Sequence, residues 1–169
     1  MTENTQNGVI SDLTEILRLL LILASRKINL QHILYLIAFL TFGLGDAITG
    51  ALMMHERGAA IEANPFIGYL FTTQGFDGVI TGKVWLTLLI LFATYIIQLK
   101  SPDMHWTVNG FLISLTIGGL MAVNANLTAL AGGIPQAPGA IIVVYLVLMF
   151  ILIEIGSFVD GHSTRVKID

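Results

Sequence analysis

Seven polar residues of this largely apolar chain have the types and the order along the sequence that could carry chemistry. They are Asp46, Thr49, Glu62, Asn64, Lys83, Asn124 and Asn126. Carboxylates beside an ammonium group can bind a cation, a proton or a lipid headgroup, and two carboxylates with separated pKa values can act as acid and base. A charge at the centre of a bilayer costs about 2.5–3.5 kcal/mol on insertion scales, so such residues normally face the bundle and pair. We therefore expect Lys83 to pair with Asp46 or Glu62.

The elements that position these residues follow from the composition of the chain. Of its 169 residues, 55% are hydrophobic and only 11% are charged, whereas about a quarter of the residues of a soluble domain are charged. A helix needs roughly 20 apolar residues to cross a bilayer. The sequence therefore predicts an integral membrane protein with several crossings and with the lipid bilayer as its surroundings. The net charge of −3 and the scattered basic residues give no support to a nucleic-acid partner.

Four apolar stretches predict an all-α bundle of four transmembrane helices. The predicted spans are Leu30–Met54, Val79–Leu99, Val108–Ala131 and Gly139–Val159. On this reading the chain divides into a polar N-terminus with an amphipathic helix (1–29), a transmembrane domain (30–159) and a short tail (160–169).

Two further helices are predicted outside the spans. Asp12 and Glu15 form a capping box before a short apolar stretch that ends at Ser25, which favours an amphipathic helix lying in the interface. Asn64 and Pro65 are typical of a helix start, and Gly75 is typical of a helix end. A helix of this length is too short to cross, so we expect it to be re-entrant or interfacial.

The basic residues predict the orientation in the membrane. Arg57 lies in the loops of one side, and Lys83 lies just inside a span. The basic residues of the opposite side are Arg18, Arg26, Lys27, Lys100, Arg165 and Lys167. The positive-inside rule then predicts a cell-membrane protein with both termini in the cytoplasm, and it places the seven polar residues in the outer half.

Three interpretations of these polar residues remain open. Lys83 can bind one carboxylate while the amides satisfy helix ends, which would only lock the bundle. Alternatively, the group can form a small pocket for a cation, a proton or a lipid headgroup. In the third interpretation, another chain completes the site.

The polar order resembles that of a family of small prokaryotic four-span membrane proteins of unknown function. The resemblance covers roughly Leu30 to Leu130 and rests on D-x-x-T, G…E-x-N-P, a lysine at the start of the next span and an asparagine late in the third. The residues that carry it include Asp46, Thr49, Gly58, Glu62, Asn64, Pro65 and Lys83. It implies a shared fold and a shared polar core, and no reaction.

Other candidate residues are isolated. Glu154 stands alone in the fourth span, where it could bind a proton, bond to Ser114 or Thr116 or a backbone carbonyl, or contact a partner subunit. His55 is a weak candidate metal ligand, because the adjacent residues of a helix point in different directions. The patterns HExxH and GxSxG and the Gly-rich phosphate loop are absent from the sequence, and no cofactor is predicted.

The sequence therefore supports three classes of function. We expect a non-catalytic accessory or structural subunit of a larger membrane complex, whose partners are other membrane subunits or further copies of this chain. A small ion, proton or solute transporter or channel with a polar site in the outer half is the alternative. An intramembrane enzyme that uses Asp46 and Glu62 is the third class, and the absence of a catalytic motif favours a chain that is not an enzyme.

Overall fold

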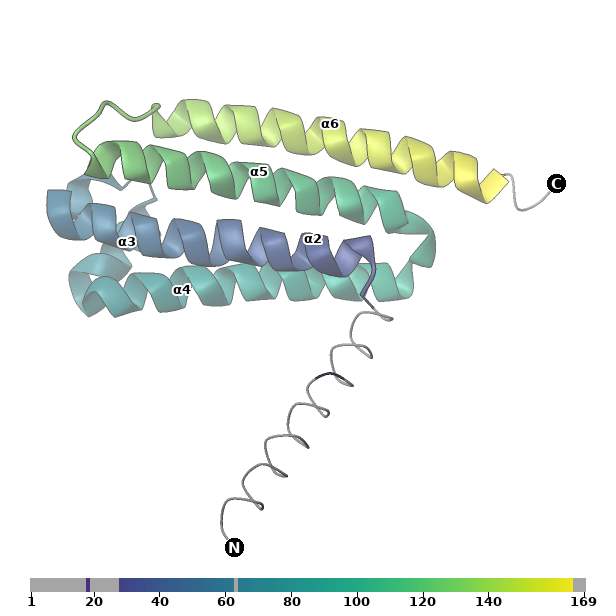
Figure 1. Cartoon of the computed structure of the whole chain (residues 1–169), viewed down its shortest axis with the longest axis horizontal. Coiled ribbons are helices and arrows are strands. Elements are labelled where there is room, and N and C mark those ends of the chain that lie inside the picture. Colours follow the sequence, from purple (N-terminus) through teal and green to yellow (C-terminus); the bar gives the residue numbers. More distant parts are fainter. Residues whose placement is uncertain (1–17, 19–27, 63, 166–169) are drawn as a thin grey trace, which may run out of the picture. The chain divides into compact units, whose positions relative to one another are not determined.

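The computed structural model describes Arg18 and residues 28–62 and 64–165 (Figure 1). The chain divides into two units, Met1–Ile33 and Leu34–Asp169. The predicted amphipathic helix up to Ser25 lies outside the described residues except for Arg18. The described elements are all helical: α2 (Leu30–Ala38), the π-helix η1 (Phe39–Gly45), α3 (Asp46–Arg57), η2 (Ala59–Ile61), α4 (Pro65–Lys100), η3 (Pro102–Met104), α5 (His105–Leu130) and α6 (Pro138–Arg165).

The described residues contain four helical stretches that are long and apolar enough to cross a membrane. These stretches are Leu30–Arg57, Pro65–Lys100, Pro102–Leu130 and Pro138–Ser163. The prediction of a membrane protein with four candidate spans is therefore confirmed at this level. Helix α6 continues to Arg165, so Asp160 and His162 are helical.

Helix α5 is the centre of the second unit. It packs against α6 on one side and against α3 and η1 on the other, while α4 packs against α3 and η1 (Figure 1). Gly110 of α5 lies directly against the backbone of Leu152, and Gly156 of α6 lies against the backbone of Trp106. Small residues at these positions let the two helices approach closely, which is how transmembrane helices gain van der Waals contact.

The start of α5 is capped by a carboxylate of α6. Asp160 accepts hydrogen bonds from the backbone N–H of Trp106 at 2.9 Å and from the N–H and hydroxyl of Thr107, each at 2.8 Å. The first N–H groups of a helix have no partner within the helix, and a carboxylate there also complements the helix dipole. Asp160 therefore fixes one end of the α5–α6 pair.

The first span is not a continuous α-helix, because η1 interrupts it just before Asp46. The backbone N–H of Asp46 donates to the carbonyl of Thr41, five residues earlier. Gly119 of α5 lies against the backbone of Thr41 and Phe42, so the wider π turn is packed directly on its neighbour. An inserted π turn rotates everything that follows it, and here it sets the direction in which Asp46 points.

Helix α4 breaks at Gly75, whose φ of 68° and ψ of −155° are non-helical. Residues 65–74 fold back along the next helical segment, since the side chain of Leu70 lies against Gly82. The helix starts as expected: the side chain of Asn64 accepts a hydrogen bond from the N–H of Phe66 at 3.0 Å, and Pro65 is the first helical residue. The start and the break match the predicted short helix, whose location in the bilayer stays a prediction.

Two apolar clusters pack the bundle above and below one polar level. The first contains Ala51, Met53, Met54, Ile67, Leu70, Val79 and Ala129. The second contains Ala38, Leu91, Val108, Leu112 and Leu115. Asp46, Lys83 and Asn126 each fall, along their own candidate span, between members of these two clusters. The packing of the bundle thus brings three polar residues to one level.

Candidate functional site

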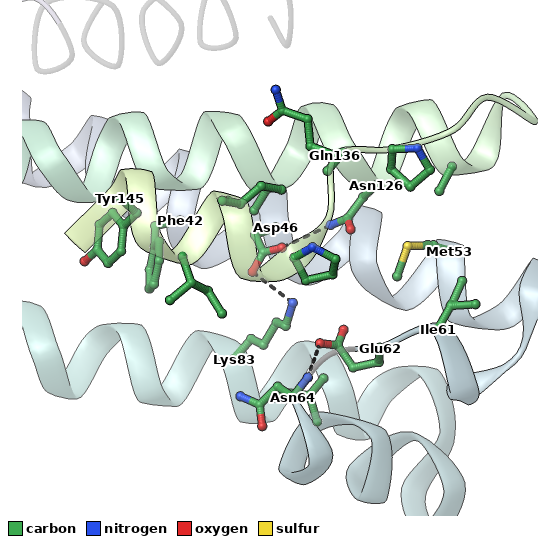
Figure 2. Close-up of a pocket in the computed structure, with 18 of the residues that line it drawn as sticks. Phe42, Asp46, Met53, Ile61, Glu62, Asn64, Lys83, Asn126, Gln136 and Tyr145 are labelled. Atoms are coloured by element: carbon green, nitrogen blue, oxygen red, sulfur yellow. Dashed lines mark hydrogen bonds and ion pairs between the residues drawn. The ribbon is translucent and has the colours of Figure 1, made fainter. Parts of the chain in front are cut away.

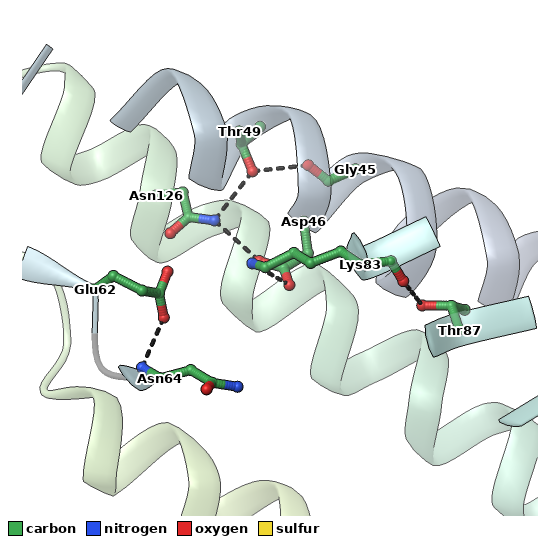
Figure 3. Close-up of polar contacts among 8 residues, drawn as sticks. All are labelled: Gly45, Asp46, Thr49, Glu62, Asn64, Lys83, Thr87 and Asn126. Atoms are coloured by element: carbon green, nitrogen blue, oxygen red, sulfur yellow. Dashed lines mark hydrogen bonds and ion pairs between the residues drawn. The ribbon is translucent and has the colours of Figure 1, made fainter. Parts of the chain in front are cut away.

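Asp46 is the centre of a polar cluster made of Asp46, Thr49, Lys83 and Asn126 (Figure 3). Lys83 Nζ lies 2.8 Å from Asp46 Oδ2, and the two side chains are 13% and 17% exposed. The amide of Asn126 donates to Asp46 Oδ1 at 3.0 Å. Both carboxylate oxygens therefore accept a hydrogen bond, one from α4 and one from α5.

The other groups of the polar cluster are also bonded. The Asn126 amide donates a second hydrogen bond to Thr49 Oγ1 at 3.1 Å, and the Thr49 hydroxyl donates to the carbonyl of Gly45 at 2.7 Å. Both N–H groups of Asn126 are thereby used. Thr87 donates to the backbone carbonyl of Lys83 at 2.9 Å, one turn below the ion pair. An ammonium has three N–H groups, and the described residues accept only one of those of Lys83.

Gly50 leaves the space that the ammonium of Lys83 occupies. A Cβ atom at Gly50 would lie 3.0 Å from Lys83 Nζ and 3.4 Å from the amide nitrogen of Asn126. A larger residue would press on the ion pair, so Gly50 makes room for the ammonium of Lys83.

Glu62 and Asn64 lie near the polar cluster and bond to each other. Glu62 Oε1 accepts a hydrogen bond from the backbone N–H of Asn64 at 2.9 Å, immediately before the cap that starts α4 (Figure 2). Of the two predicted partners for Lys83, the structure thus selects Asp46. Glu62 instead stabilises the start of α4 through its hydrogen bond with Asn64.

Three residues of the polar cluster, Asp46, Lys83 and Asn126, line a cavity of about 730 Å³. The cavity is lined by residues of α3, α4, α5 and α6, and of the connecting segments that carry Glu62 and Gln136 (Figure 2). Its remaining walls are mostly apolar and include Phe42 and Tyr145, whose rings stack with centroids 6.4 Å apart. A cavity of about 300–1,000 Å³ with few polar groups is typical of a small-ligand site.

The sequence did not point to two of the polar residues that line this cavity, Arg57 and Gln136. Arg57 ends α3 and is exposed. Its only sequence signal is that it is the one basic residue in the connections on its side of the bundle. Asn124, in contrast, is exposed and is not among the residues that line the cavity. Only one of the two predicted asparagines therefore belongs to the site.

The remaining candidates lie elsewhere. Glu154 is exposed on α6, and the hydroxyls of Ser114 and Thr116 donate to carbonyls of their own helix, those of Phe111 and Leu112. His55 is exposed at the end of α3. Across Arg18 and residues 28–62 and 64–165, no group of three or more His, Asp, Glu or Cys residues could hold a metal ion.

Comparison with known proteins gives one match. Searches of curated proteins and of solved structures found nothing similar. Residues 37–132, which include the whole polar cluster, match a family described as a domain of unknown function, DUF5658. Since the match covers more than half of the chain, the protein belongs to the DUF5658 family.

Proposed function

We propose that this protein is a non-catalytic membrane protein that binds an amphipathic ligand in the cavity beside the polar cluster. One observation carries the proposal: a neutralised, hydrogen-bonded group of polar side chains lines part of an otherwise apolar cavity of about 730 Å³. A ligand with a polar head and an apolar body would match both parts of this surface.

The hydrogen bonds argue against a catalytic use of the two carboxylates. Asp46 accepts from Lys83 and Asn126, and Glu62 accepts from the backbone of Asn64. Asp46 is the counter-ion of Lys83 and joins α3 to α4 and α5, and Glu62 stabilises the start of α4 through Oε1. Both carboxylates thus have structural roles that a binding function preserves, whereas acid and base chemistry would have to change the protonation of these groups.

The packing also argues against an open channel in this conformation. Beyond the polar level, the second apolar cluster fills the bundle with buried residues such as Leu112 and Leu115. A transporter would have to open this cluster to pass a solute. The transporter alternative therefore requires a second conformation, whereas a binding function requires only the cavity as it stands.

The orientation and the family pattern complete the proposal. The positive-inside rule supports a cell-membrane protein with cytoplasmic termini, which puts the cavity in the outer half. The prokaryotic origin and the use of Asp46, Thr49, Glu62, Asn64, Pro65 and Lys83 as a family signature are part of the same proposal. The family match supports the signature, since residues 37–132 contain all six positions.

Filling the cavity tests the binding function. Ala125 lines the cavity from α5, and Leu120 of the same helix is 53% exposed on the lipid side. Native mass spectrometry of the full chain in mild detergent should show a bound amphiphile for the wild type and for Leu120→Trp, and a strong loss for Ala125→Trp. Equal occupancy in all three proteins would contradict the proposal.

A subunit role is a second candidate, and the exposure of Glu154 favours it. Glu154 lies on α6 among exposed apolar residues, with Ile151 at 47%, Ile155 at 55% and Phe158 at 68% exposure. Ionisable residues inside membranes almost always face a partner group or a bundle interior. A partner helix that offers a donor to Glu154 would meet this requirement.

The subunit role is tested on the protein extracted from its own membrane. A stoichiometric partner should be present with the wild type and with Ser163→Leu, which changes the opposite face of α6, and should be lost with Glu154→Leu. A partner that stays bound to Glu154→Leu, or the absence of any partner from the wild type, would rule out this role for Glu154.

A further inference from the structure

We infer that the ligand is a lipid whose headgroup carries an oxyanion, either phosphate or carboxylate, which Lys83 and Arg57 bind. This inference rests on the proposed binding function and specifies the class of ligand. It follows from the N–H groups of Lys83 and Arg57 that remain unused and from the half-exposed apolar residues in the wall of the cavity.

Lys83 supplies the first donors. One N–H of its ammonium bonds to Asp46 Oδ2, and the other two have no acceptor among the described residues. Lys83 lines the cavity, and its ammonium bonds to Asp46 and fits into the space beside Gly50. A ligand oxygen placed there would receive a charge-assisted hydrogen bond, which is stronger than one between neutral groups.

Arg57 supplies a second group of donors. Its side chain lines the same cavity and makes no hydrogen bond or ion pair with the described residues. A guanidinium has five N–H groups in a planar fork that matches the oxygens of phosphate and carboxylate. Two cations from different helices, α3 and α4, thus have donors left over at one cavity.

The carboxylate of Asp46 is already used inside the polar cluster, because both of its oxygens accept hydrogen bonds there. Glu62 accepts from the backbone of Asn64 through Oε1. The unused N–H groups of Lys83 and Arg57 are therefore the cationic donors that the cavity offers to a ligand, and an oxyanion headgroup matches them.

The side of the cavity indicates a lipid rather than a free anion. Three wall residues within the candidate spans are half exposed: Leu86 of α4 at 47%, Ile142 of α6 at 52% and Leu146 of α6 at 48%. Helix α6 packs mainly against α5, which leaves its side toward α4 for the cavity. In a bilayer this side faces acyl chains, so a hydrocarbon tail can lie between α4 and α6 while the headgroup reaches Lys83.

The experiment compares ligands with and without an oxyanion and with and without acyl chains. The delipidated full chain in non-ionic detergent is titrated with dioleoylphosphatidylglycerol, oleate, dioleoylglycerol and inorganic phosphate, and occupancy is read by native mass spectrometry. The phosphatidylglycerol or oleate should bind at least about tenfold more tightly than dioleoylglycerol, which has the same chains without an oxyanion. Phosphate alone should not bind measurably, and the stronger of the two oxyanion lipids identifies the headgroup.

The outcomes separate this inference from the proposed function. If dioleoylglycerol binds as tightly as the oxyanion lipids, the cavity binds amphiphiles and the oxyanion inference is wrong. If none of the lipids binds, the proposed function itself is wrong. Binding of inorganic phosphate as tight as that of the lipids would show that the tail contributes nothing, which would also overturn the inference.

Two variants test whether Lys83 and Arg57 bind the oxyanion. Lys83→Met should abolish the preference for the oxyanion lipid, and Arg57→Gln should reduce it severalfold while the fold persists, because Arg57 is exposed and unbonded to the described residues. Lys100→Gln, which removes an exposed cation in the last turn of α4, is the matched control and should bind like the wild type. If Lys83→Met does not fold, Arg57→Gln decides, and an unchanged preference in Arg57→Gln would overturn the assignment.

Discussion

The ammonium of Lys83 and the carboxylate of Asp46 lie 2.8 Å apart, on α4 and α3, in a pair that is mostly shielded from the surroundings of the protein. Asn126 of α5 holds the second carboxylate oxygen. The three helices are thus joined at one level by a single acidic group, beside the cavity.

Breaking the ion pair from one side should destabilise the protein strongly. Asp46→Asn leaves the ammonium of Lys83 without its counter-charge, and loss of one partner of a buried pair costs about 3–5 kcal/mol. We expect a large fall in the melting temperature of the detergent-solubilised protein, measured by tryptophan fluorescence. The double variant Asp46→Leu with Lys83→Met should recover part of the loss. A double variant less stable than either single variant would show that the pair is not what couples these positions.

Gly50→Ala should weaken the site although alanine favours helices. The new Cβ atom would lie 3.0 Å from Lys83 Nζ, so the ammonium has to move. The melting temperature should fall and ligand occupancy should decrease. Gly161→Ala is the matched control, since Gly161 is helical with open space around its Cβ position, and it should be neutral or slightly stabilising. A Gly50→Ala protein as stable as Gly161→Ala would mean that the site tolerates the methyl group.

Gly75→Ala tests the break in α4. The φ of 68° with a ψ of −155° lies in a region that is essentially restricted to glycine, and we expect a cost of about 1–3 kcal/mol. Gly139→Ala, at an open position in α6, provides the comparison. Equal thermal stability of the two variants would indicate that the break in α4 does not require glycine at position 75.

Asp160→Ala tests the cap between α6 and α5. The substitution removes the acceptor of two backbone N–H groups and one hydroxyl, and removal of a helix cap costs about 0.5–2 kcal/mol. The melting temperature should fall more than for Ser163→Ala, whose hydroxyl bonds only to its own helix at Val159. Ligand binding should persist, because Asp160 is not among the residues that line the cavity. Loss of binding at unchanged stability would contradict this separation.

Local signals in the sequence predict the candidate spans and the start of the short helix at Pro65. Long apolar stretches gave the four candidate spans, because a bilayer dictates helix length. Asn64, Pro65 and Gly75 mark the start and the break of a helix through their own backbone chemistry. The cost of a charge within a span also made a partner for Lys83 necessary, and the sequence left two carboxylates as candidates.

Other features depend on how helices turn and pack, which a single sequence does not display. The π turn at Phe39–Gly45 rotates Asp46, and only the resulting direction decides between Asp46 and Glu62 as the partner of Lys83. The same holds for Asn124 and Asn126, which lie two residues apart and so face different sides of α5. The cap by Asp160 joins residues more than 50 positions apart. The cavity arises from the spacing of four helices, so Arg57 had no local signal of a binding role.

Photo-crosslinking can show whether a lipid occupies this cavity. The full chain in native-like membranes is labelled with a lipid that carries a photoreactive group in its acyl chain, and the sites are mapped by peptide mass spectrometry. Labels should concentrate at Leu86, Ile142 and Tyr145, and they should be lost in Ala125→Trp and retained in Leu120→Trp. Labels spread evenly over exposed apolar residues such as Trp85 and Phe92, which are 62% and 63% exposed, and unchanged by Ala125→Trp would contradict it.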